Sequence, residues 1–118
     1  MSNGQLQLVN YGQAKALKAL GFDFPTRGYY RERYYNAGLY NWNNDPFSED
    51  YSAPTVSLAL KWCRDVKGVK YDIYYDCFGW DFNFSWKHGN GYEDYNDAES
   101  VLLDAVTAKI KRQEGGAG

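Results

Sequence analysis

The stretch SAPTVSLALKWCRDVKGVKYDIYYDCFGWDFNFSWK, residues 52–87, contains a helix pattern followed directly by two strand patterns. Ser52 is a good N-cap, Pro54 falls in the first turn where its missing N–H costs nothing, and Gly68 can end the helix. The apolar residues between them recur at spacings of three and four and therefore share one face. They are Val56, Ala59, Leu60, Cys63 and Val66, and Leu58 and Trp62 form a second apolar pair that widens this face. The pattern predicts an amphipathic helix that packs across a sheet.

The residues after this helix alternate between apolar and polar, as half-buried strands do. The apolar positions are odd-numbered up to Cys77 and even-numbered from Trp80 onward. A two-residue hairpin loop at Gly79-Trp80 would produce this switch, and glycine in the first loop position suits a type II′ turn. Such a loop leaves Trp80 exposed. The predicted pairs are Cys77 with Phe82, Tyr75 with Phe84, Ile73 with Trp86, Asp72 with Lys87, and Asp76 with Asn83.

Two further helices are predicted from their ends. Asn10 and Gln13 have the spacing of a capping box, and Gly21 is a natural residue to follow the last turn. Asn96 and Glu99 form a second capping box that opens the last helix. The apolar stripe of that helix is Ala98, Val101, Leu102, Ala105, Val106 and Ile110.

The segment over residues 24–51 predicts a second hairpin followed by a loop. Asn36-Ala37-Gly38 would be a three-residue loop that sets Tyr34 opposite Tyr40. Strands and helices without a βαβ pattern predict a small two-layer α+β domain, with an antiparallel sheet packed by about three helices. We expect one domain over residues 1–112 and a flexible tail over residues 113–118.

The composition is that of a folded protein with an unusual aromatic content. The chain has 118 residues, of which 24% are charged, and its net charge of −2 excludes binding to nucleic acid by bulk charge. No apolar run is long enough to span a membrane, and no signal peptide is visible, so we expect a cytoplasmic protein. Twelve Tyr, six Phe and four Trp make up 19% of the residues.

The sequence contains no catalytic or metal-binding constellation, and we expect neither enzyme activity nor a cofactor. Cys63 and Cys77 both fall on apolar faces and are predicted to be small buried residues. His88 lies in a turn predicted over residues 88–91, opposite Tyr71 and far from Cys77. Seven acids between positions 72 and 99 are predicted to form a solvated face and helix caps: Asp72, Asp76, Asp81, Glu93, Asp94, Asp97 and Glu99.

Several of these signals occur together in a known group of proteins. They are the run from Tyr51 through Pro54 and Trp62 to Gly68, the aromatic strand pair, and the Tyr92-x-x-Tyr95-x-x-Ala98-Glu99 entry to the last helix. Together they resemble a group of small proteins without established activity that are encoded by bacteriophages and prophages of gut bacteria. The resemblance implies a phage or prophage protein that works inside a bacterial host, and it transfers no functional residue.

The candidate interaction residues are aromatic rings interleaved with arginines. Such residues dominate protein-binding hot spots, so we expect a non-enzymatic module that binds another protein or a second copy of itself as a homodimer. The alternative is a single-stranded nucleic-acid-binding protein that uses residues 27–42, because rings stack on bases and arginines neutralise phosphates. Up to Gly68 the chain carries eight basic and six acidic residues, which places any such face in this part. The candidates are Arg27, Tyr29, Tyr30, Arg31, Arg33, Tyr34, Tyr35, Tyr40, Trp42 and Trp80.

Overall fold

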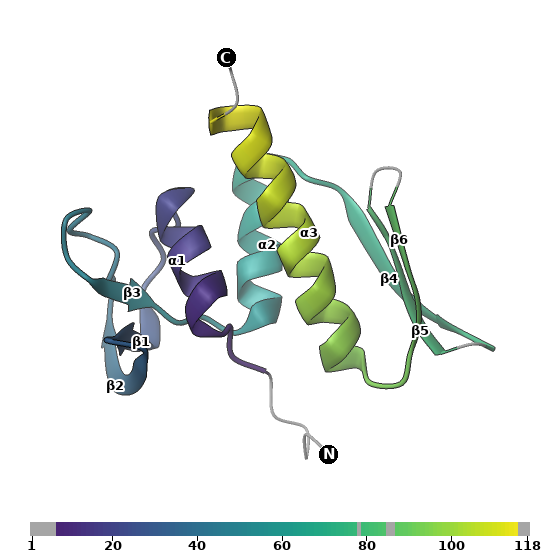
Figure 1. The fold of residues 1–118 in the computed structure, drawn as a ribbon, viewed down its shortest axis with the longest axis horizontal. Coiled ribbons are helices and arrows are strands. Elements are labelled where there is room, and N and C mark those ends of the chain that lie inside the picture. Colours follow the sequence, from purple (N-terminus) through teal and green to yellow (C-terminus); the bar gives the residue numbers. More distant parts are fainter. Residues whose placement is uncertain (1–6, 78, 85–86, 116–118) are drawn as a thin grey trace.

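The computed structural model describes residues 7–77, 79–84 and 87–115, and it confirms an α+β fold. In this part of the chain, helices α1 (Tyr11–Ala19), α2 (Val56–Lys67) and α3 (Tyr95–Gly115) stand between two antiparallel sheets (Figure 1). The first sheet has the order β2-β1-β3, and the second has the order β4-β5-β6. Their strands are β1 (Thr26–Arg31), β2 (Tyr34–Tyr40), β3 (Asp50–Ser52), β4 (Tyr71–Asp76), β5 (Gly79–Phe84) and β6 (Lys87–Tyr92).

The predicted start of α1 is confirmed. Gln13 N donates to Asn10 Oδ1 at 2.8 Å, and Asn10 N donates to Gln13 Oε1 at 2.9 Å, so the capping box is complete. Gly21 has a φ of +96°, and Phe22 N donates to Leu17 O at 3.0 Å to close the last turn. The signals local to this helix are therefore sufficient to define it.

The predicted cap of α2 is wrong by three residues. Thr55 caps the helix, and its hydroxyl accepts from Leu58 N at 3.1 Å, whereas Ser52 is buried in β3. The chain stays extended up to Thr55 because Leu8 forms a β-bridge with it and Val56 N donates to Gln7 O. Gly68 ends the helix as expected, with a φ of +73°.

The buried face of α2 also differs from the expected stripe. Val66 is exposed, whereas Trp62, from the second apolar pair, is buried. The helix packs on α3 on one side and against Phe22 on another, and the indole of Trp62 meets the Phe22 ring at 5.4 Å. Val66 lies on the remaining, solvent-facing arc.

The start of α3 differs from the predicted capping box. The helix begins at Tyr95, and the Asp94 carboxylate accepts from Asn96 N at 2.9 Å, so Asn96 is not the cap. Glu99 is buried and accepts from the hydroxyls of Ser57 and Tyr95. The other stripe residues lie inward except the exposed Val101, and Leu103 is buried in addition. The helix extends to residue 115, beyond the expected domain end at 112.

The second sheet keeps the predicted faces but not the predicted register. Ile73 lies opposite Phe82, Tyr75 opposite Trp80 and Asp76 opposite Gly79, so the hairpin turns two residues earlier than predicted. Gly79 belongs to β5, where a Cβ would stand only 2.7 Å from Tyr92 O in the neighbouring strand. Only glycine allows β6 to approach so closely.

This shift overturns the other contacts expected of the hairpin. The predicted pairs of Cys77 with Phe82, Tyr75 with Phe84 and Asp76 with Asn83 are wrong. The pairs of Asp72 with Lys87 and Ile73 with Trp86, and the position of His88 opposite Tyr71, are also wrong, and Trp86 itself lies outside the described residues. The predicted turn over residues 88–91 belongs to strand β6. The observed partners are Asp72 with Asn83, Tyr71 with Phe84, Asn83 with His88, and Phe84 with Lys87.

The first hairpin turns at Glu32 and Arg33, not at residues 36–38. Both residues have left-handed φ angles, +54° and +72°, as a type I′ turn requires. Tyr34 therefore lies opposite Arg31, and Tyr40 lies opposite Thr26. The segment between β2 and β3 is a loop, as expected.

Candidate interaction surface

Four aromatic residues form one face of the first sheet, which we call the outer aromatic face: Tyr29, Tyr34, Tyr40 and Trp42. Tyr29 and Trp42 stack with ring centroids 3.8 Å apart and planes at 26°. The indole N–H of Trp42 donates to Gly38 O at 2.7 Å, and the Tyr40 ring meets the indole edge-on at 5.1 Å. Tyr34 lies opposite Arg31, two residues along from Tyr29, so strand alternation places it on the same face.

The outer aromatic face has two rings held by contacts and two rings exposed to solvent. Tyr29 and Trp42 are half-buried against each other, whereas Tyr34 is 74% exposed and Tyr40 is 53% exposed. Trp42 is held by a stack, an edge contact and a hydrogen bond. A ring held in this way loses little conformational freedom on binding.

The opposite face of the same sheet points toward the helices. The Tyr30 hydroxyl donates to Val9 O at 2.7 Å, and the ring meets Tyr11 of α1 edge-on at 5.9 Å. Burial raises the pKa of Tyr30 above its usual value. Tyr35 packs beside Tyr30, at 5.9 Å between ring centroids. Tyr30 is therefore a packing residue and does not belong to the exposed interaction residues.

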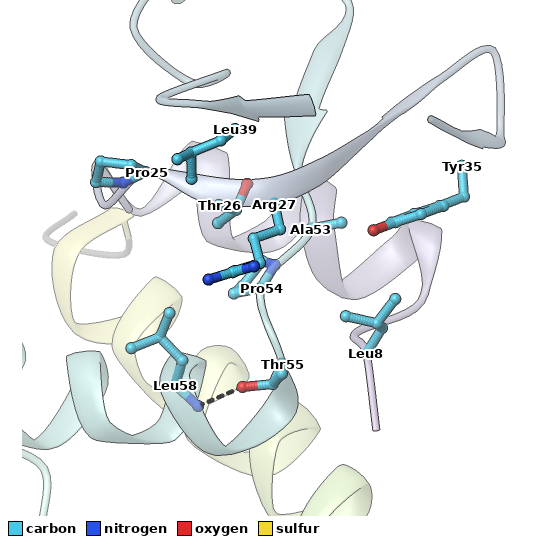
Figure 2. A pocket seen from close by; sticks show the side chains of 10 residues that line it. All are labelled: Leu8, Pro25, Thr26, Arg27, Tyr35, Leu39, Ala53, Pro54, Thr55 and Leu58. Carbon is cyan, nitrogen blue, oxygen red and sulfur yellow. Dashed lines mark hydrogen bonds between the residues drawn. The ribbon is translucent and has the colours of Figure 1, made fainter. Parts of the chain in front are cut away.

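A shallow groove of about 280 Å³ lies on this inner side (Figure 2). Tyr35 and Leu39 reach it from β2. Leu58 comes from the first turn of α2, and Leu8 from the segment that bridges to Thr55. The guanidinium of Arg27 extends over Pro54 at its centre. The remaining lining residues are Pro25, Thr26 and Ala53. The groove is mostly apolar and carries one cationic side chain.

The three arginines of the segment are distributed over the sheet. Arg31 Nε and Nη2 donate to the two carboxylate oxygens of Asp50 at 2.7 and 2.8 Å, and its guanidinium lies 5.4 Å from the Tyr29 ring centroid. The hydrogen bond from Arg31 holds the pKa of Asp50 below its usual value. Arg33 lies over the Tyr11 ring at 5.8 Å. Arg27 lines the groove.

Trp80 does not join the other nine candidates. It lies in β5 of the second sheet, between the rings of Tyr75 at 5.3 Å and Tyr95 at 4.9 Å. The helices separate this sheet from the first (Figure 1). The predictions that Trp80 stands in a loop and is exposed are both wrong, because the hairpin turns before Gly79 and the indole is half-buried between two tyrosines.

The acidic residues and the cysteines differ from the expected pattern in three places. Asp81 is buried, accepts from Gly91 N at 2.6 Å, and has a raised pKa, chiefly because its carboxyl group is hydrogen-bonded to that of Asp76. Glu99 is buried as described above. Cys77 is exposed, whereas burial raises the pKa of Cys63 to about 12.

The described residues hold neither a cluster of metal-ligating side chains nor a membrane-spanning helix. No three or more His, Cys, Asp and Glu side chains gather there as metal ligands would. None of the helices in that part of the chain is long and apolar enough to cross a membrane.

Two exposed side chains outside the candidate set belong to the same region. Leu39 stands at the edge of β2, and Phe47, in the loop before β3, projects almost entirely into solvent. The sequence of residues 34–40 has no charged residue, and this is the signal by which Leu39 could have been included among the interaction residues. No sequence signal distinguishes Phe47 from a core residue.

Comparison of the chain with protein-family models, curated proteins and solved structures finds no match. The resemblance to phage and prophage proteins therefore stays an expectation.

Proposed function

We propose that this protein is a non-enzymatic interaction module of phage or prophage type that binds a partner protein inside a bacterial host. The binding surface is the outer aromatic face of the first sheet. The observation that carries the proposal is the stacked pair of Tyr29 and Trp42, which holds a ring cluster in place beside the exposed rings of Tyr34 and Tyr40. Rigid Tyr and Trp side chains supply large contact areas at low entropic cost.

The chemistry of this face indicates the chemistry of its partner. The rings are uncharged, and their phenol groups can donate or accept hydrogen bonds. A matching surface would be apolar and would carry backbone or side-chain acceptors at its rim.

The alternative partner, single-stranded nucleic acid, has less support. Binding of this kind needs cations along the phosphate track beside the stacking rings. Arg31 is next to the rings but forms a bidentate ion pair with Asp50. Arg27 and Arg33 are directed to the groove and to Tyr11. We therefore favour a protein partner.

The test is capture from host extract with three versions of the full-length chain. The double variant Tyr34→Ser, Tyr40→Ser removes the two exposed rings, whereas Tyr75→Ser is a matched control, because Tyr75 is 68% exposed on the second sheet. We expect a protein that is retained by the wild type and the control and lost with the double variant. Retention by all three would contradict the assigned surface, and recovery of nuclease-sensitive nucleic acid alone would favour the alternative.

A further inference from the structure

Strand β2 forms an edge of the first sheet. It pairs with β1 on one side, and within the described part of the chain no strand lies on its other side. Proteins protect such edges with charged residues, proline or a short strand, because an open edge can pair with another chain. The sequence of β2, YYNAGLY, is seven residues long and contains neither a charge nor a proline.

The register shows which backbone groups point outward. A two-residue turn at Glu32 and Arg33 makes Arg31 and Tyr34 a hydrogen-bonded pair, and such pairs alternate along an antiparallel ladder. The N–H and C=O groups of Asn36 therefore face β1 as well. On the far side of β1, Gly28 O accepts from Ala53 N, as this alternation requires.

The same alternation directs the N–H and C=O groups of Tyr35 and Ala37 away from β1, toward the open edge. Beyond Ala37 the register shifts, because Tyr40 and not Leu39 lies opposite Thr26. An antiparallel second strand that places its own Ala37 opposite Ala37 would make these two residues a hydrogen-bonded pair.

The strand is complementary to itself in this register. Tyr35 would lie opposite Leu39 of the second copy, and Tyr34 opposite Tyr40 of the second copy. Both pairs are of the aromatic and apolar kinds that stabilise antiparallel strands. Because β2 carries no charge, two copies bring no like charges together along the strand.

The exposed area of the large side chains of β2 sets an upper limit on the area that the dimer can bury. Leu39 is 73% exposed and Tyr35 is 44% exposed, in addition to the exposed Tyr34 and Tyr40. At about 200 Å² for a large side chain, these four expose roughly 500 Å² per copy, or about 1,000 Å² for two copies, which is the most that they can bury. This is about the lower limit for a specific interface.

We propose that the protein forms a homodimer in which two β2 strands pair antiparallel about a two-fold axis at Ala37. The pairing joins the two first sheets into one six-stranded sheet and makes the two outer aromatic faces continuous. On the inner side, Tyr35 and Leu39 of the second copy would extend the apolar surface that lines the groove. The inference rests on the proposed function, since it names one partner, a second copy, for the same sheet.

The two-fold axis makes residue 37 a specific probe. In the dimer, the two side chains at this position face each other, so Ala37→Lys and Ala37→Glu each place like charges in contact. An equimolar mixture of the two variants places opposite charges there instead. The matched controls are Val66→Lys and Val66→Glu, at an exposed apolar position of α2.

The experiment is sedimentation equilibrium of the full-length chain over a dilution series. We expect a wild-type dimer, a rise of about tenfold or more in its dissociation constant for each Ala37 variant, recovery in the mixture, and no change in the controls. A wild-type protein that is monomeric throughout would overturn the pairing. A dimer that tolerates both Ala37 variants would also overturn it.

Two further measurements keep the result interpretable. Circular dichroism checks that the variants are folded. If the charged variants fail to fold, Ala37→Pro removes the outward N–H without removing a bond to β1, and it should also give a monomer. A monomeric wild type that still captures a protein through Tyr34 and Tyr40 would refute the dimer and leave the proposed function standing.

Discussion

The phenol ring of Tyr35 lies over the backbone of Gly28, in the space that a Cβ at residue 28 would occupy. Gly28 is buried in β1, and Tyr35 reaches across from β2 on the groove side of the first sheet. The position of the ring therefore depends on the absence of a side chain one strand away.

Gly28→Ala should consequently displace the ring and destabilise the protein. The added methyl group overlaps ring atoms, and overpacking of this kind costs about 1–3 kcal/mol in unfolding free energy. Urea denaturation measures the loss. Gly12→Ala is the control, because a Cβ there has only Asn10 Oδ1 as a near neighbour, at 3.5 Å, and alanine favours the helix. Equal stability of Gly28→Ala and the wild type would contradict the packing described.

The ion pair of Arg31 with Asp50 makes stability depend on pH in one direction. The folded pKa of Asp50 lies below its ordinary value of 3.8, so the unfolded chain binds a proton first as the pH falls. The contribution of the pair is complete above that ordinary value and is lost as the pH falls through the folded pKa. Because Arg31 is exposed to solvent, the contribution is small.

Asp50→Asn should therefore be less stable than the wild type at neutral pH and approach it below about pH 4. Arg31→Gln should follow the same course, since it removes the other partner. Thermal unfolding midpoints across this range provide the measurement. A stability gap that does not change with pH would show that the pair is not formed in solution.

The carboxyl pair of Asp76 and Asp81 makes stability depend on pH in the opposite direction. Its hydrogen bond raises the pKa of Asp81 in the folded protein, so the folded state binds more protons than the unfolded state above pH 3.8. This pair therefore opposes folding at neutral pH, and its cost disappears as the pH falls.

Asp76→Asn should raise the unfolding midpoint at neutral pH, because an amide can donate to the Asp81 carboxylate where a second carboxylate cannot. The advantage over the wild type should decrease as the pH approaches 4. Thermal unfolding at several pH values checks both statements. A variant less stable than the wild type at neutral pH would count against the assigned cause.

The two thiols should react at very different rates in the folded protein. Cys63 is fully buried with a pKa of about 12, whereas Cys77 is exposed at the tip of a hairpin. Titration with a disulfide reagent should modify one thiol quickly and the second only after unfolding. Cys77→Ser should remove the fast phase, and a fast phase that persists in this variant would contradict the burial of Cys63.

Sequence signals were sufficient where the structure depends on neighbouring residues. The capping box of Asn10 and Gln13 and the stop at Gly68 involve contacts within one turn, and both are confirmed. The cap of α2 was predicted wrongly because Ser52 and Thr55 are both suitable residues. The choice between them depends on the bridge from Leu8, which is distant in sequence.

Strand register depends on contacts that alternation does not encode. Alternation assigned Ile73 and Phe82 to one face correctly, but a face is compatible with several registers. In the first sheet the turn residues Glu32 and Arg33 have no turn propensity of the usual kind, whereas Asn36-Ala37-Gly38 resembles a turn and lies inside β2. Which tyrosines are exposed follows from that register, so the candidate surface could be predicted only as a segment.

Residue-resolved amide hydrogen exchange of the full-length chain at low and high protein concentration tests the central claim most directly. The claim is that another chain adds to the sheet at the edge of β2. It predicts that the amide of Ala37 exchanges quickly in dilute solution and becomes protected at high concentration. The Asn36 amide, which bonds to β1, should be protected throughout. Rapid exchange of the Ala37 amide at every concentration would contradict the account.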